Sequence, residues 1–206
     1  MKTAIQDWLG TDATRLPDSI RGDCLNIVQY ELLSHNELSF GEFSDTFSTV
    51  VATRGYVLPT GWVQPHTLWY INPDTTSVVF LRYLDKERFD LNFPDSAKTG
   101  KPSAYTVWGQ QIQLGKTPDV VVTVNRNYFR TLADLADGAP NNENDLTKNA
   151  WQVLLYGGLK ESERFGIEDA RLPQWTARYN ELKDALVTQH ARARTSGRRP
   201  QSREPS

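Results

Sequence analysis

PSAYTVWGQQIQLGKTPDVVVTVNRNY, residues 102–128, gives the clearest local indication of the fold. Ala104–Trp108 and Gln111–Leu114 lie in a part of the chain that is rich in Val, Thr, Tyr, Phe and Trp, and Gly109 between them predicts a tight hairpin. Val120–Tyr128 follows, and valines at alternate positions give it one apolar face. This part of the chain therefore predicts three strands with short connections.

More strands are predicted on the N-terminal side of this stretch. Phe43–Thr53, Thr67–Ile71 and Ser77–Leu84 share its composition, and the turn signal Asn72–Asp74 separates the last two. Asn92–Pro102 has two prolines, a glycine and two lysines, which predicts a long exposed loop. Many short strands with turns between them favour a small antiparallel sandwich or barrel.

Helical patterns stand on both sides of the strands. Thr3–Leu9 and Pro17–Ser34 are predicted helices before them, and Asp145–Arg164 is one after them. The last of these contains Gly157-Gly158, a pair that allows another helix to approach closely. A final helix is predicted after Ile167, with Pro173 in or near its first turn.

An aromatic and leucine stripe marks the final helix. Trp175, Tyr179, Leu182 and Leu186 repeat at four, three and four residues, which is helical spacing. Such a stripe is typical of a packed core rather than of a cofactor site. The residues predicted to form the helix-packing core are Trp151, Leu155, Trp175, Tyr179, Leu182 and Leu186.

The order of helices, strands and helices predicts an α+β fold. We expect a helical bundle built from the N- and C-terminal segments, with an inserted antiparallel β-sandwich or barrel domain. The predicted parts are residues 1–40 and 131–190 for the helical domain, 41–130 for the β domain, and 191–206 for an extended basic C-terminal arm.

Charge is distributed unevenly along the 206 residues. The whole chain has 23 basic and 25 acidic residues, a net charge of −2. The arm holds one acid, Glu204, so it has a net charge of +4, and the other residues together have −6. Two interpretations of the arm stay open, a solvated disordered end or a segment that orders on an acidic partner or on phosphates. The arm's basic residues are Arg192, Arg194, Arg198, Arg199 and Arg203.

Few residues point to catalysis or metal binding. Cys24 is the only cysteine, and its place in a helical pattern predicts a small buried side chain. The histidines are His35, His66 and His190, far apart in sequence, and His66 is predicted on a surface loop. We therefore expect no metal, no cofactor and no enzymatic activity. No apolar run approaches the roughly 20 residues that span a bilayer, so no membrane partner is expected.

Several motifs occur in a fixed order. They are Gly55-Tyr56-Val57-Leu58-Pro59, the hairpin Pro102–Trp108 with Gln111–Leu114 and Pro118, the strand Val120–Tyr128, the helical Leu154-Leu155-Tyr156-Gly157-Gly158, and Trp175 with Tyr179 and Leu182. Over about residues 15–190, this order resembles that of the head-to-tail adaptor (connector) proteins of tailed bacteriophages, especially the short-tailed kind.

The resemblance implies a structural virion protein. It implies a ring, usually a dodecamer of neighbouring copies, that binds the portal protein, extends the DNA channel, and offers a platform to a tail nozzle or tail tube protein. It places the chain at the phage neck, after assembly in the host cytoplasm. It also implies that residues 191–206, with their five arginines, reach the portal.

The charge pattern fits such a role. An acidic body can line a channel through which double-stranded DNA slides without sequence readout. Lys98 and Lys101 lie in the predicted loop, which could contact a neighbour or the tail. In a ring with two unlike faces, exposed aromatic residues are candidate interface anchors. The alternative is a soluble binding or enzyme module with a disordered basic tail, which predicts a pocket with convergent polar groups.

Overall fold

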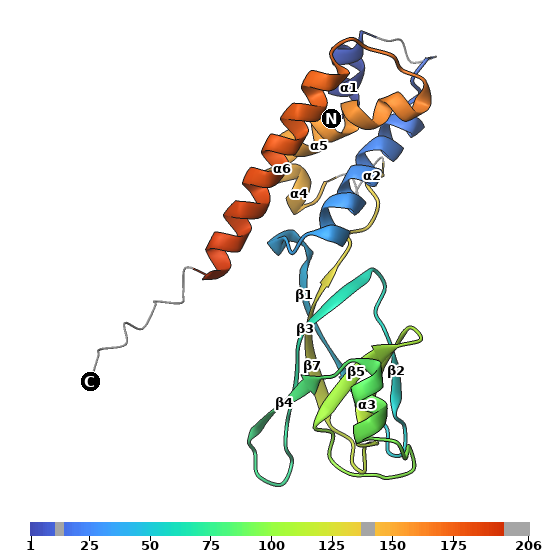
Figure 1. Cartoon of the computed structure of the whole chain (residues 1–206), viewed down its shortest axis with the longest axis vertical. Coiled ribbons are helices and arrows are strands. Elements are labelled where there is room, and N and C mark those ends of the chain that lie inside the picture. The colour runs from blue at the N-terminus through green and yellow to red at the C-terminus, as the bar shows by residue number, and fades with distance from the viewer. Residues whose placement is uncertain (11–14, 137–142, 196–206) are drawn as a thin grey trace, which may run out of the picture. The chain divides into compact units, whose positions relative to one another are not determined.

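The structure is a computed structural model that describes residues 1–10, 15–136 and 143–195. It belongs to the predicted α+β class, with six helices and one seven-stranded sheet among the described residues. The chain divides into two compact units, a helical unit (residues 1–41 and from 131 onward) and a β unit (residues 42–130) (Figure 1). Arg198, Arg199 and Arg203 lie outside the described residues.

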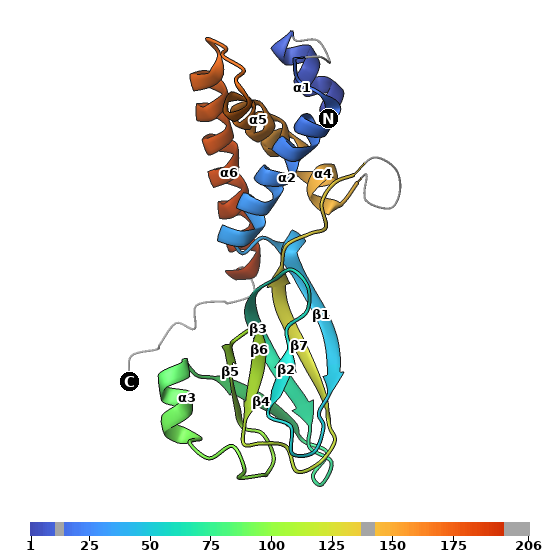
Figure 2. The same cartoon turned by 90° about the vertical axis from the view of Figure 1, so that its right-hand side faces the viewer.

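The helical unit contains the helices at or near the predicted places, and Figure 2 shows α2, α5 and α6 in it. One predicted helix, Asp145–Arg164, is broken at Ala150, whose backbone has φ −133°. The helices are α1 (Lys2–Leu9), α2 (Asp18–His35), α4 (Asp145–Asn149), α5 (Trp151–Glu161) and α6 (Leu172–Thr195), with 3-10 turns η1 (Ser39–Gly41) and η2 (Ser162–Phe165).

The glycine pair of α5 is where the helices come closest. A Cβ on Gly157 would lie 2.6 Å from Val28 Cγ1 of α2 and 3.0 Å from Tyr179 Cε2 of α6. A Cβ on Gly158 would lie 2.8 Å from Ile5 Cδ1 of α1. These distances are too short for a side chain, so the predicted close approach at this pair is confirmed.

The chain that returns from the β unit is fixed to α2 by side-chain amides. Asn26 donates from Nδ2 to the carbonyl of Leu135 (3.1 Å) and accepts from the backbone N–H of the same residue (2.7 Å). Gln29 donates to the carbonyl of Ala133 (2.9 Å) and accepts from Asn144 (2.6 Å). Asn144 also caps α4 through a reciprocal capping box. These amides satisfy backbone groups that would otherwise lie unpaired beside the core.

The β unit is a curled mixed sheet, a half-barrel, with strand order β1-β7-β3-β4-β5-β6-β2. The predicted antiparallel sandwich or barrel is therefore wrong in detail. β4 and β5 pair in parallel, because the chain between them returns through helix α3 (Lys86–Asn92) and a loop. The strands are β1 (Glu42–Ser48), β2 (Gly55–Val57), β3 (Trp62–Ile71), β4 (Val78–Tyr83), β5 (Ala104–Trp108), β6 (Gln111–Gly115) and β7 (Thr123–Arg130).

One face of the sheet holds the core of the β unit. Leu68 and Tyr70 of β3, Leu114 of β6 and Val124 of β7 are all buried there. On the other face α3 packs on β5, where Phe89 and Ala104 are buried together. Asp85 caps α3 by accepting from the backbone N–H of Arg88. α3 lies in a stretch for which no helix was predicted.

The chain enters and leaves the β unit at the same end of the sheet. Glu42, the first residue of β1, is the register partner of Phe129 near the end of β7. Ser48 pairs with Thr123 at the other end, and the turn between β3 and β4 lies there too, because Tyr70 pairs with Val124. The β3–β4 turn is thus remote from both chain connections of its own unit.

Candidate partner-binding surfaces

The basic arm starts on a helix. α6 continues to Thr195, so the first residues of the predicted extended arm, including Arg192 and Arg194, are helical. The prediction that the arm is extended from residue 191 is wrong at this point. Alanine and arginine are strong helix formers, and the first helix-breaking residue in the arm is Gly197.

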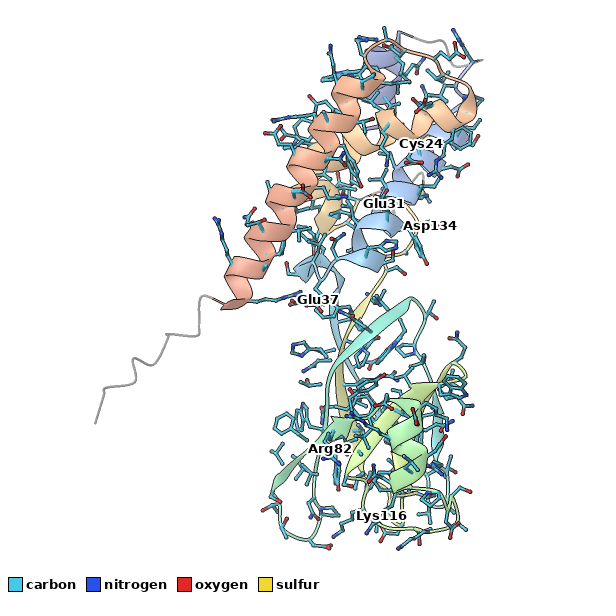
Figure 3. The ribbon with its side chains drawn as sticks, viewed as in Figure 1. Cys24, Glu31, Glu37, Arg82, Lys116 and Asp134 are labelled. Carbon is cyan, nitrogen blue, oxygen red and sulfur yellow. The ribbon has the colours of Figure 1, made fainter. Side chains whose placement is uncertain are left out.

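Contacts near residue 40 hold the end of α6. Arg194 Nη1 pairs with Glu37 Oε2 at 2.7 Å (Figure 3). His190 Nδ1 lies 2.9 Å from Ser39 Oγ and accepts from the backbone N–H of Ser39 at 3.3 Å. The His190 ring also meets the Phe40 ring edge-on, with centroids 4.9 Å apart. We call Glu37, Ser39, Phe40, His190 and Arg194 the α6 clasp, because it fixes the point from which the arm departs.

The structure places the predicted packing residues in two groups. Leu155, Trp175 and Tyr179 are buried in the core of the helical unit, and Leu182 and Leu186 pack against it half-buried. Trp151, by contrast, is 48% exposed.

The prediction for Trp151 is therefore wrong. The break at Ala150 ends α4, so α5 starts in a new helical phase and its first residue turns outward. There the indole borders a hollow of about 220 Å³, which Leu182 and Leu186 also line.

Buried charge in the helical unit is paired. The Glu161 side chain is 1% exposed and lies 3.2 Å from Lys160 Nζ and 2.9 Å from Arg164 Nε. Lys160 also lies 3.7 Å from Glu31 of α2. Burial, and then the negative charge of Glu31, raise the pKa of the Tyr179 phenol. The cluster joins α5 to α2, and we assign it a structural role because each buried charge has a partner.

Cys24 is a core side chain, as predicted. It is fully buried in α2, and Figure 3 labels it within the helical unit. Burial, and then the charges of Glu161 and Asp23, raise the pKa of the thiol to about 11. A thiol with such a pKa is a poor nucleophile near neutral pH. His66 is exposed as predicted, although it stands on β3 rather than on a loop.

Within the described ranges, no three His, Cys, Asp or Glu side chains are placed to hold a metal ion.

The predicted loop at residues 92–102 is exposed for most of its length. Lys98 is exposed, whereas Lys101 is ion-paired with Asp74 in the β3–β4 turn. Thr117 anchors the loop by donating from Oγ1 to the carbonyl of Ser96 at 2.6 Å. The two predicted lysines thus differ, since Lys98 extends from the loop and Lys101 ties it to its own unit.

Two features were not predicted from the sequence. Glu37 and Arg194 are 157 residues apart, and no local pattern joins them. The second feature is the set of exposed apolar residues on β4, and the sequence does contain a pattern that indicates it. Val78 through Leu81 are apolar at every position, and a strand with only one buried face does not need this. Phe80 is 65% exposed on the face that the core does not use.

The family model of the SU10 adaptor protein matches residues 1–203. The chain therefore belongs to the SU10 adaptor protein family, and the expected kinship with phage adaptor proteins is confirmed. This family is structural. Comparison with curated proteins gives no match. Each helix in the described ranges is too short or too polar to cross a membrane.

Proposed function

We propose that this adaptor protein forms a ring at the phage neck that joins the portal to the tail nozzle or tail tube and extends the DNA channel. The ring is a dodecamer in this proposal, it assembles in the host cytoplasm, and residues 191–206 dock on the portal. The family match over residues 1–203 is the observation that carries the proposal. Membership of a structural family counts against the alternative of a soluble enzyme module.

The two units differ in charge, which supports a division of roles. Residues 1–41 and 131–190 carry 9 basic and 16 acidic residues, whereas residues 42–130 carry 9 basic and 8 acidic ones. The acidic excess thus lies in the helical unit. We assign the lining of the DNA channel to this unit, because a negative wall repels phosphates and lets DNA slide. The nearly neutral β unit, with Lys98 on its exposed loop, is assigned to the tail.

The α6 clasp supports the role of the arm. Arg194 and His190 fix the last turns of α6, so the arm departs from a defined point. A tethered segment loses less freedom on docking than a free one. Its arginines can then form charge-assisted hydrogen bonds with carboxylates of the portal.

A truncation tests the arm. A chain that ends at Thr195 keeps the clasp and the whole described fold. We expect an unchanged melting temperature and the loss of portal binding in a pull-down with purified portal. As a charge control, replacement of Arg198, Arg199 and Arg203 by glutamine keeps the length of the arm and should weaken binding comparably. Normal portal binding by the truncated chain would show that residues 196–206 do not dock on the portal.

The position of the chain in the particle tests the ring. Cryo-electron microscopy of the phage neck should show this chain between portal and tail, with its helical unit toward the DNA. Density for the chain at any other position would contradict the proposed function.

A further inference from the structure

An apolar ladder is exposed on the β3–β4 hairpin. Trp69 pairs with Phe80 and Ile71 pairs with Val78, so all four side chains share the face opposite the core residue Leu68. Ile71 is 54%, Val78 53% and Phe80 65% exposed, whereas Trp69 is half-buried. We call these four residues the β4 ladder. Side chains of this kind usually form the buried face of a sheet or of an interface.

A cation stands at the end of the ladder. Arg82 follows Phe80 by two residues, so it lies on the same face, and it is exposed (Figure 3). Over the ranges that the structure covers, the Arg82 guanidinium has no ion pair and the Phe80 ring contacts no other ring. The fold of the chain therefore leaves both side chains available to another molecule.

A second, smaller apolar patch lies on β2 and β5. Trp108 and Val57 both pair with Gln111 of β6, and they are 59% and 74% exposed. We call Val57 and Trp108 the Trp108 patch. In the described part of the chain, neither a ring nor a cation contacts the Trp108 indole.

The two patches are separate on the outer face of the sheet. α3 covers the sheet between them, with Phe89 beside Ala104 of β5 and Phe93 against Gly115 of β6. β5 pairs with β4 at Arg82 and runs from there away from the β3–β4 turn. Trp108, at the end of β5, and the β4 ladder therefore lie toward opposite ends of the sheet. The two patches of a single copy cannot contact each other.

We infer that the β4 ladder and Arg82 of one copy bind the Trp108 patch of the next copy. This inference rests on the proposed ring and specifies which surfaces form it. A ring requires two unlike, complementary surfaces on each subunit, and the curl of the sheet turns the two patches, on β3–β4 and on β5 and β2, in different directions. Arg82 supplies a cation without an ion pair and Trp108 supplies the aromatic face on which a cation is most stable. Phe80 and Val57 supply apolar contact, and Trp and Arg are the side chains that most often anchor interfaces.

A single contact of this kind is weak. A stable interface buries about 800 Å² on each partner, and two patches of a few side chains supply only its centre. Binding to a common portal raises the effective concentration of neighbouring copies and stabilises contacts that free chains do not hold. The test therefore traps the contact in copies assembled on the portal.

Engineered cysteines allow this contact to be cross-linked. Cys24 is buried with a raised pKa, so it stays unreactive toward maleimides in the folded protein. Val78→Cys and Val57→Cys place one thiol within each patch, at an exposed position. With a short bis-maleimide on portal-bound chains, the double variant should give a series of cross-linked oligomers, seen as gel bands up to the closed ring. A mixture of the two single variants should stop at dimers, and either variant alone should stay monomeric.

Two results would overturn the interface. One is a double variant that forms no bands beyond the monomer, and the other is efficient linking of Val78→Cys to itself, which indicates a symmetric pair. Leu91→Cys on α3, paired with Val57→Cys, is the collision control, since Leu91 is 75% exposed and outside both patches. The control pair should link at least tenfold less.

Substitutions of Arg82 and Trp108 test whether these two side chains hold the interface together. Arg82→Glu or Trp108→Ala in the double-cysteine chain should lower the yield of linked bands at least tenfold, whereas Lys98→Glu should not. All of these side chains are exposed, so the melting temperature should stay unchanged. If anchor variants link normally, the assigned contact is wrong. If the chain is found in the phage neck but its copies do not cross-link, only this interface is refuted. If the chain is absent from the neck, the proposed function is refuted.

Discussion

Gly157 stands where three helices leave no room for a side chain. A Cβ there would lie 2.6 and 2.8 Å from the two methyl groups of Val28. Gly157→Ala is therefore expected to lower the free energy of unfolding by about 1–3 kcal/mol, despite the gain in helix propensity. Urea unfolding, followed by far-UV circular dichroism, measures the change.

Gly22 provides the matched control. A Cβ on Gly22 would meet only Lys2 Cε at 3.2 Å and Nζ at 3.3 Å, the far end of a flexible side chain. Gly22→Ala should be neutral or stabilise α2 by up to about 1 kcal/mol. Equal losses from the two substitutions would show that crowding at Gly157 is not the cause.

The Cys24 thiol makes stability depend on pH in the alkaline range. Its pKa is about 11 in the folded chain and 9.0 as the ordinary value, so above pH 9 the unfolded chain binds fewer protons. Stability from this group is complete below pH 9 and is lost as pH rises toward 11, by at most about 1.4 kcal/mol per pH unit.

Comparison with Cys24→Ala isolates the thiol, because buried tyrosines titrate in the same direction. The difference in the free energy of unfolding between the two chains should shrink from pH 8.5 to pH 10.5. A constant difference would contradict the assigned burial.

Sequence patterns predicted some residue roles and not others. The burial of Cys24 and the close approach at Gly157 follow from helical spacing, which is local. Trp151 was assigned to the core because Asp145–Arg164 was interpreted as one helix. The break at Ala150 depends on how α4 and α5 pack, which no local pattern specifies.

At the scale of elements, the α6 clasp is expected to protect the last turns of α6. An exposed ion pair contributes only about 0.2–1 kcal/mol, so the melting temperature should change little when it is removed. Arg194→Ala should instead increase local fraying, seen as faster amide hydrogen exchange after residue 188.

Two further variants test whether the pair between Glu37 and Arg194 is what protects the end of α6 from exchange. Glu181→Gln removes the local pair with Arg178 and should leave exchange at the end of α6 unchanged. The charge swap Glu37→Arg with Arg194→Glu should restore protection. Unchanged exchange in Arg194→Ala would show that the clasp does not hold the helix end.

Apolar residues at helical spacing made α2 and α6 predictable, and strand-like composition with a turn at Gly109 did the same for β5, β6 and β7. α3 was missed because its seven residues carry only two apolar side chains, Phe89 and Leu91. The parallel pairing of β4 with β5 was missed because it depends on the path of the chain through α3 and the following loop. Strand partners far apart in sequence are chosen by packing of the whole unit.

At the scale of the whole molecule, the β unit should be removable. Its first and last strands start and end side by side, with Glu42 opposite Phe129, and such partners lie about 5 Å apart. The helical unit has its own core, which includes Leu32 and Leu154. Replacing residues 42–130 with about four Gly/Ser residues should leave a cooperatively folding helical unit.

Circular dichroism and a single sigmoidal urea transition would verify this. The complementary fragment, residues 42–130 alone, should also fold, around buried side chains such as Tyr70 and Ile112. An excised helical unit without a cooperative transition would show that its core is incomplete alone. The order of helices, strands and helices was readable from sequence, whereas the strand order and the two exposed patches depend on the assembled sheet.

The adjacency of β1 and β7 also has a mechanical consequence. When a load pulls the β unit away from its tether points, both connections are pulled from the same end and in the same direction. Because β1 is an edge strand that pairs only with β7, its share of the tension enters the sheet as shear along all the β1–β7 hydrogen bonds together, and these bonds are not peeled open one at a time. From β7 the force passes on to its pairing with β3, which lies further inside the sheet. In the proposed ring, this joint would resist rupture under the pressure of packed DNA.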